Sequence, residues 1–216
     1  MICWSCEKEA GGDPLCGSCG APQPLDPAAG SDHFAVLSVE RRHELDLSAL
    51  EARYKDLSRK LHPDRFARAD PRARRASLQR TVQLNEAWRA LKDPVKRAEY
   101  LLELEGVKLA TDDGGVRSGG VAASPALLME ILELREELGE ARLAKDDARV
   151  ARMGDVMRAR AAQAMARVTE GLAGARTRER LEAVARELVA LRYYRRFLDE
   201  VAAHDEARER ERSAHG

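Results

Sequence analysis

The chain has 216 residues, which is long enough for one or two domains with a sizeable core. Lys plus Arg and Asp plus Glu number 37 each, so the net charge of zero excludes a molecule-wide field for nucleic acid. No stretch approaches the roughly 18 consecutive apolar residues of a membrane span. No basic-then-apolar leader precedes the first cysteine, so we expect a cytoplasmic protein without a membrane partner.

Aromatic residues make up only 4% of the chain and charged residues 34%, and Ala, Leu, Glu and Arg are abundant, which predicts an all-α protein. Changes in composition divide the chain into a four-cysteine module, a Pro/Ala/Gly linker, a first helical domain, a Gly- and Ser-rich linker and a second helical domain. The bounds of these five segments are 1–20, 21–31, 32–106, 107–124 and 125–210.

The cysteines form two pairs, Cys3-x-x-Cys6 and Cys16-x-x-Cys19, with nine residues between them. Each pair can hold a metal through a tight turn, and four thiolates complete a closed tetrahedral site. We therefore predict one structural Zn²⁺ per chain in a small zinc-ribbon-like module. Two disulfides are the rival interpretation, which a reducing cytoplasm disfavours, and a redox-active pair is a third. The role of the metal stays open between stabilising the N-terminus, self-association and contact with a partner.

The first helical domain contains two long predicted helices separated by His62-Pro63-Asp64. The first of these helices begins at Asp46 or Ser48. Its buried stripe follows the spacing 4, 3, 4: Leu50, Tyr54, Leu57 and Leu61. Its outer face is basic: Arg53, Lys55, Arg59 and Lys60. Because Pro63 cannot continue a helix, the chain breaks there and exposes the tripeptide.

The second long helix of this domain begins at Asp70-Pro71, an N-cap followed by a proline at the first helical position. Its apolar stripe contains Leu84, Trp88 and Leu91 and is interrupted by Asn85. A shorter helix follows Pro94 and is closed by Gly106. Residues 32–37 supply a short helix that can pack beneath the resulting hairpin.

The apolar periodicity of the second helical domain predicts three antiparallel helices. The first of them carries a core stripe of Leu127, Ile131, Leu134 and Leu138. It also carries a surplus of apolar residues on an adjoining face: Leu128, Met129 and Leu132. The last helix likewise has two stripes, one of Leu181, Val184, Leu188 and Leu191 and one of Tyr194, Phe197 and Val201. The surplus faces are either a wide core or an exposed surface for a partner.

Several segments resemble the HscB (Jac) family of iron–sulfur co-chaperones. DHFAVLSV, YKDLSRKLHPDRF and NEAWRALKDPVKRAEYLLELEG are similar to its J-domain, and LLMEILELREEL and RFLD are similar to its C-terminal helices. The cysteine pairs, beginning with CWSC, resemble the metal-binding extension of animal-type members. The chain departs from the family pattern at Arg65, where Lys is usual, and at residues 121–124, which replace a frequent Arg.

The resemblance implies two binding surfaces. One would dock on a DnaK/HscA-type chaperone and stimulate its ATPase: His62, Pro63, Asp64, Arg65, Lys55, Arg59 and Lys60. The other would bind the IscU-type scaffold on which clusters are built: Leu128, Met129, Leu132, Glu133, Glu136 and Phe197. Both surfaces are interpretations carried over position by position.

We therefore expect a co-chaperone that delivers the scaffold to its chaperone. A general J-protein with other clients is the first alternative, and the absence of a Gly/Phe-rich linker argues against it. A zinc-dependent nucleic-acid-binding protein is the second, and the zero net charge argues against it. We expect no enzymatic activity, because the sequence has no phosphate-binding glycine loop and no coherent set of nucleophile and base.

Overall fold

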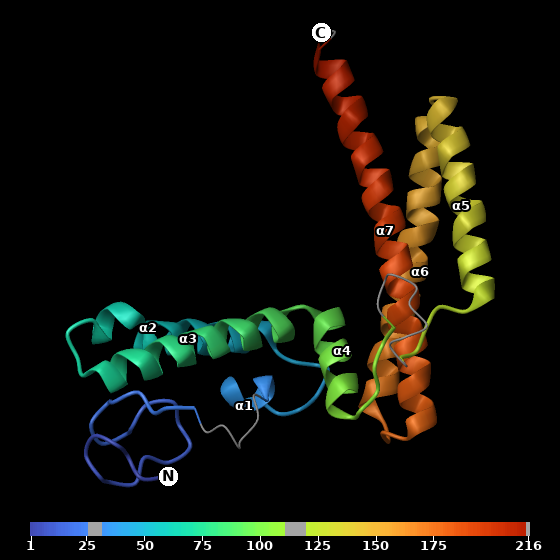
Figure 1. Ribbon diagram of the computed structural model, residues 1–216. Coiled ribbons are helices and arrows are strands. Elements are labelled where there is room, and N and C mark those ends of the chain that lie inside the picture. Colours follow the sequence, from blue (N-terminus) through green and yellow to red (C-terminus); the bar gives the residue numbers. More distant parts are fainter. Residues whose placement is uncertain (26–31, 111–119, 215–216) are drawn as a thin grey trace. The chain divides into compact units, whose positions relative to one another are not determined.

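The computed structural model describes residues 1–25, 32–110 and 120–214, and these residues form helices and no strand. The linker residues 26–31 and 111–119 lie outside the described residues. The chain divides into two compact units, Met1–Arg97 and Ala98–Gly216. The elements are α1 His33–Val36, α2 Leu47–Leu61, the 3₁₀-helix η1 Pro63–Phe66, α3 Pro71–Lys92, α4 Pro94–Leu104, α5 Pro125–Leu143, α6 Asp147–Ala173 and α7 Arg178–Ala214 (Figure 1).

The hairpin of α2 and α3 forms the framework of the first unit, and α1 packs against α3. Asp46 caps α2 by accepting hydrogen bonds from the amides of Ser48 and Ala49. Asp70 caps α3, with Pro71 at the first position, as the sequence predicts. Leu50, Leu57 and Leu61 of the predicted stripe are buried, so the apolar face of α2 points into the core.

Asn85 interrupts the apolar stripe of α3 because it is the hydrogen-bond partner of the half-buried Tyr54. The Tyr54 hydroxyl donates to Asn85 Oδ1 at 3.0 Å, and the Tyr54 ring stacks on Trp88 with centroids 4.8 Å apart. A half-buried tyrosine hydroxyl needs such a partner. The polar interruption of the stripe therefore ties α2 to α3 instead of weakening their contact.

A buried arginine closes the other end of the hairpin. Arg97 is only 4% exposed and donates to the main-chain carbonyls of His43 and Leu91. The His43 ring nitrogen Nε2 lies 3.0 Å from the carbonyl oxygen of Pro94. Burial chiefly lowers the pKa of His43, although the contact with Pro94 acts in the opposite direction. These contacts fix the loop before α2 against the start of α4.

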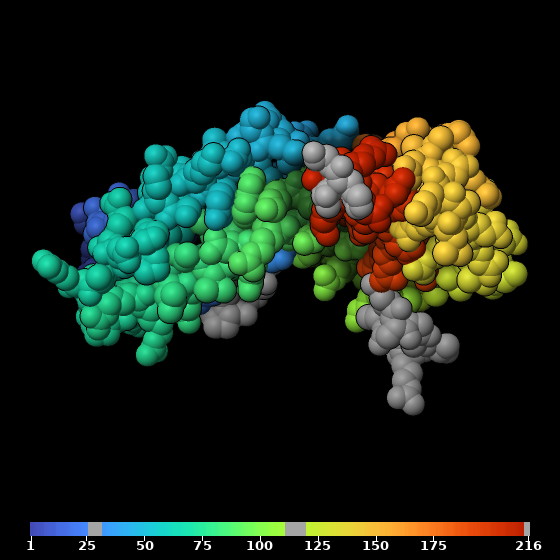
Figure 2. Space-filling view, turned by 90° about the horizontal axis from the view of Figure 1, so that it is seen from above, coloured from blue at the N-terminus to red at the C-terminus, as the bar shows by residue number. Residues whose placement is uncertain are grey.

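The second unit contains the predicted three-helix bundle of α5, α6 and α7, which lie side by side in both views (Figures 1 and 2). Ser124 caps α5 and Asp146 caps α6. Both predicted stripes of α7 are buried: Leu181, Val184, Leu188, Leu191, Tyr194, Phe197 and Val201. For α7, the surplus apolar residues therefore belong to a wide core.

One carboxylate anchors the C-terminal part of α7 to the start of α6. Asp147 accepts from Arg208 at 3.1 Å and from Arg212 at 3.3 Å, and it lies 3.2 Å from His204 Nε2. The hydrogen bond from Arg208 is the main reason that the pKa of Asp147 is lowered. A 37-residue helix is thereby held to its neighbour beyond the last buried apolar residue, Val201.

Candidate functional site

The four cysteines converge on one point. Their Sγ atoms all lie within 4.8 Å of one another, with Cys3 and Cys16 buried and Cys19 exposed. The shortest separations between sulfurs are 3.7 Å for Cys3–Cys19 and 3.8 Å for Cys6–Cys16. Both greatly exceed the roughly 2.05 Å of a disulfide, so all four thiols are free. Such a set can bind one metal ion in a closed tetrahedral site.

The module is built from two equivalent turns, which we call the first knuckle (residues 3–8) and the second knuckle (residues 16–21). The amide of Cys3 donates to Lys8 O and that of Glu7 to Cys3 O. Thirteen positions later, the amide of Cys16 donates to Ala21 O and that of Gly20 to Cys16 O. Antiparallel bridges repeat in the same way, Ile2 with Glu9 and Leu15 with Pro22. The repeat is visible in the sequence as Cys-x-Ser-Cys after an aliphatic residue, which occurs twice at an offset of thirteen residues and was not predicted.

Polar groups around Cys3 favour its thiolate, whereas those around Cys6 do not. The Ser5 amide donates to Cys3 Sγ at 3.4 Å, and the buried Gln23 Nε2 donates to the same sulfur at 3.3 Å. Burial acts to raise the pKa of Cys3, but the amides of Cys6 and Ser5 and the neighbouring thiols together lower it to about 6. The pKa of Cys6 is raised to about 11: the Lys8 amide lowers it, but burial and the three other sulfurs outweigh that effect. A bound cation would remove this competition for protons.

The predicted tripeptide stands at the end of α2 as an exposed loop. His62 leaves the helical conformation with φ −55° and ψ 129°, and Pro63 starts η1. The amide of Asp64 donates to His62 Nδ1 at 3.3 Å, and the Asp64 side chain is 89% exposed. The loop thus presents a carboxylate and an imidazole whose positions are set by the turn itself. Arg65 is exposed beside them.

The loop rests on a buried anchor that sequence reasoning did not find. The Leu61 carbonyl, the last of α2, accepts from Ser77 Oγ at 2.6 Å and from Thr81 Oγ1 at 3.2 Å. A helix interrupted by proline leaves such a carbonyl without its usual amide donor. Two hydroxyls one turn apart on α3 replace that donor. They are the reason that the tripeptide projects from a fixed position.

The basic face of α2 is present as predicted but is partly neutralised. Lys55 pairs with Glu51 and Lys60 with Asp56, each at 2.8 Å and each one helical turn away. Arg59 is exposed. Surface pairs of this kind contribute little stability and exchange readily for another partner. Opening these two pairs would therefore cost little free energy.

The surplus apolar residues of α5 form an exposed face, in contrast to those of α7. Leu128, Met129 and Leu132 are 43%, 59% and 54% exposed. The acidic side chains Glu133 and Glu136 are exposed beside them. Phe197, which the resemblance assigns to the same surface, is only 1% exposed and lies in the bundle core. The described structure therefore brings five of the six predicted residues to the surface, and Phe197 is not among them.

Comparison with known proteins assigns both units. Residues 32–100 match the DnaJ domain, and residues 123–202 match the HSCB C-terminal oligomerisation domain. The structure is similar to chaperone HscB from Vibrio cholerae, with 30% sequence identity and a TM-score of 0.68, over 82% of this chain and 98% of that chain. The chain belongs to the HscB family. Its fold is also similar to that of human co-chaperone protein HscB, with a TM-score of 0.77 at 23% identity, over 95% of this chain and 98% of that one.

These matches confirm the predicted family and the predicted all-α fold. HscB is a family of J-domain co-chaperones and not of catalytic enzymes. In the described parts of the chain, no helix combines the length and the apolar character that a membrane crossing requires.

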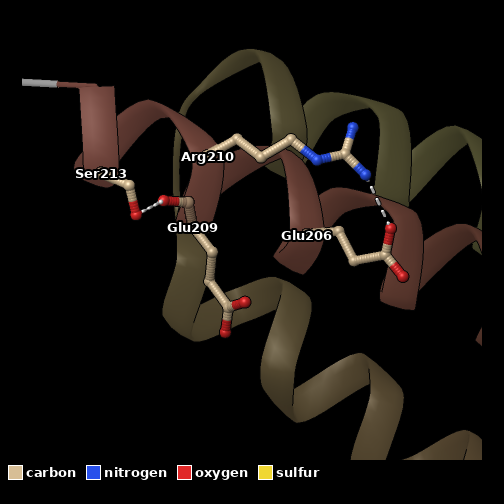
Figure 3. A pocket seen from close by; sticks show the side chains of 4 residues that line it. All are labelled: Glu206, Glu209, Arg210 and Ser213. Carbon is tan, nitrogen blue, oxygen red and sulfur yellow. Dashed lines mark hydrogen bonds and ion pairs between the residues drawn. The ribbon is translucent and has the colours of Figure 1, made fainter.

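A hollow near the end of α7 carries no such assignment. It is lined by Glu206, Glu209, Arg210 and Ser213, all from one helix (Figure 3). Arg210 pairs with Glu206 at 3.0 Å, and the Ser213 hydroxyl donates to the main chain of Glu209 at 2.9 Å. Such contacts within one helix are ordinary for a solvated surface.

Proposed function

We propose that this HscB-family chain stimulates ATP hydrolysis by a DnaK/HscA-type chaperone and delivers an IscU-type scaffold to it during iron–sulfur cluster assembly, in the cytoplasm. Residues 32–106 act as the J-domain and residues 125–210 as the scaffold-binding bundle, joined to the four-cysteine module by residues 21–31 and to each other by residues 107–124. The observation that carries the proposal is the exposed His62-Pro63-Asp64 loop on its buried anchor. Nucleic acid and membranes have no part in it.

Each part of the docking loop has a physical task. The Asp64 carboxylate suits a bidentate arginine of the chaperone, and the anchored Leu61 carbonyl holds it in place. The basic side chains around the loop steer an acidic surface of the chaperone toward it and increase the association rate: Lys55, Arg59, Lys60 and Arg65. Since the protein supplies no reacting group, its effect on ATP hydrolysis is exerted through the chaperone's conformation.

The exposed face of α5 is the proposed scaffold-binding surface. Leu128, Met129 and Leu132 are its apolar anchors, and Glu133 and Glu136 form its polar rim. A small apolar centre with a charged rim is the usual anatomy of a protein interface. Phe197 is buried in the bundle core and would affect this face only through the packing of the bundle. Binding the scaffold and the chaperone at once raises the effective concentration of each for the other.

We further propose that the four thiols hold one structural Zn²⁺. Four sulfur ligands in a closed set favour zinc over harder cations and leave no open position for a substrate. The module has no core of its own beyond Cys3, Ala10 and Cys16 with their partly buried neighbours among the described residues. A bound metal therefore supplies much of its folding free energy.

The deciding experiment measures ATP turnover by the chaperone alone, with this protein, with the scaffold, and with both. The proposal expects stimulation that rises synergistically when scaffold is present. Asp64→Asn should abolish stimulation, because it removes the charge but leaves the exposed loop intact. Stimulation that ignores the scaffold would assign the chain to other clients, and its complete absence would refute the J-domain assignment.

The scaffold surface has its own test. Replacing Leu128, Met129 and Leu132 together by Ala should weaken scaffold binding by about 2–4 kcal/mol in a calorimetric titration. Val156→Ala, an equally exposed apolar residue of α6, is the matched control. An unchanged affinity of the triple variant, with the wild-type melting temperature, would place the scaffold elsewhere.

A further inference from the structure

A groove runs between the second knuckle and the basic face of the J-domain. Its volume is about 540 Å³. One wall consists of module residues 13–17, 19 and 20, and the other comes from α2 and η1: Arg53, Leu57, Lys60, Arg65 and Phe66. The second wall leads directly into the His62-Pro63-Asp64 loop, because η1 begins at Pro63. The groove is thus continuous with the proposed chaperone-docking loop.

The module is fixed in this position by polar contacts to α3. Arg80 donates to the main-chain carbonyls of Gln23 at 2.9 Å and Pro24 at 3.0 Å. The Arg72 guanidinium lies over the Trp4 ring, 5.6 Å from its centroid, and Trp4 Nε1 donates to Pro22 O at 2.9 Å. The Gln23 side chain in turn donates to Cys3 Sγ. The metal site, its outer contacts and α3 therefore form one connected structure.

The side chains of the groove have a clear polarity. The J-domain wall carries three cations, Arg53, Lys60 and Arg65, whereas Asp13 is the acidic side chain on the module wall. Pro14 and Leu15 add apolar surface to the module wall, and Leu57 and Phe66 add it to the other. A tetrathiolate site with a divalent metal carries a charge of about −2, and two of its ligands, Cys16 and Cys19, line the module wall. An occupant must therefore turn its acidic edge toward α2 and its apolar edge toward the knuckle.

We propose that the second knuckle is a wall of the chaperone-docking surface and that the groove receives an extended acidic and apolar segment of the ATP-bound chaperone. This inference rests on the proposed function, since it extends the same docking surface beyond the J-domain. It gives the metal module a direct part in partner recognition. The module's role is then not confined to stabilising the N-terminus.

A bulky side chain in place of Gly17 should block the groove. It lines the groove, is exposed, and an added Cβ would meet no atom within 4 Å. Its φ lies outside the positive range, and the equivalent position of the first knuckle is Trp4. The backbone of a knuckle therefore accepts tryptophan at this position. Ser18, the next residue, is exposed and does not line the groove, so Ser18→Trp is the matched control.

The experiment measures the concentration of full-length protein that gives half-maximal stimulation of the chaperone's ATPase. Gly17→Trp should raise it about tenfold or more, because a blocked site loses its contacts as a unit. Gly17→Ala and Ser18→Trp should remain near the wild-type value. Bound metal, measured per chain by atomic emission, should be unchanged in all three variants. If Gly17→Trp loses metal, the smaller Gly17→Leu replaces it.

The outcomes separate this inference from the proposed function. If wild-type protein fails to stimulate and Asp64→Asn changes nothing, the proposed function itself fails. If wild type stimulates, Asp64→Asn does not, and Gly17→Trp with full metal content behaves as wild type, the groove does not contact the chaperone. A concentration-dependent dimer that Gly17→Trp abolishes would show that a second copy occupies the groove, which also overturns the inference.

Discussion

The Leu61 carbonyl provides the sharpest test of how the docking loop is held. Ser77→Ala and Thr81→Val each remove one donor to this buried oxygen with almost no change in shape. Each single substitution leaves the other donor and should cost about 1 kcal/mol of unfolding free energy. The double substitution leaves the carbonyl unsatisfied and adds the desolvation penalty of about 1–3 kcal/mol. We therefore expect a total cost of about 3–5 kcal/mol, which exceeds the sum of the single effects.

The measurement is a double-mutant cycle by urea unfolding, combined with the ATPase assay at a temperature where every variant is folded. Half-maximal stimulation should require more of the double variant, because the tripeptide loses its fixed support. Ser48→Ala removes an exposed hydroxyl of α2 and should change stability by less than about 0.5 kcal/mol. Additive single effects with unchanged stimulation would refute the idea that this oxygen positions the loop.

Three further results are expected. Glu7 has φ 58°, and the equivalent residue of the second knuckle is Gly20 at φ 72°. Because a side chain is strained at positive φ, Glu7→Gly should stabilise the module and Gly20→Ala should destabilise it, by about 0.5–1 kcal/mol each after the change in chain entropy is subtracted. The two substitutions should shift the metal affinity in opposite directions in a competition with a chelator. Since Arg208 lowers the pKa of Asp147, this ion pair stabilises the bundle above the ordinary carboxyl pKa of about 3.9, and the stabilisation is lost as the pH falls below that value. Asp147→Asn should therefore lower the melting temperature at pH 7 and make the melting temperature fall less steeply in acid. An unchanged dependence of the melting temperature on pH would contradict the assignment. Replacing Cys3 and Cys6 by Ser should remove one metal per chain in atomic emission, and full metal content would refute the four-thiolate site.

The sequence predicts those parts of the fold that depend on local rules. Local sequence signals predict the N-cap at Asp70 and the helix break at Pro63. Helical periodicity predicts the buried stripe of α2: Leu50, Leu57 and Leu61. The convergence of the cysteines follows from the spacing of metal ligands. Each of these features is determined by a few residues that are close together in the chain.

Features that depend on contacts between residues distant in the chain could not be predicted from the sequence. Periodicity cannot tell that the surplus apolar residues of α7 are core while those of α5 are exposed, because both give the same pattern. Phe197 illustrates this limit: the resemblance assigns it to the exposed surface, but its side chain is buried in the bundle core. The hydroxyls of Ser77 and Thr81 and the guanidinium of Arg80 look like ordinary helix residues until the fold brings each to a carbonyl of another segment.

The link from Arg80 through Gln23 to Cys3 would couple the stability of the J-domain to a metal bound by the four thiols. A ligand that binds the folded state stabilises whatever folds with it, so the concentration of free metal would set part of the J-domain's free energy of unfolding. Reciprocity then requires that anything which rigidifies the J-domain also tightens its hold on the metal. A cell depleted of metal would therefore hold a co-chaperone that is both less stable and less able to recover its ion.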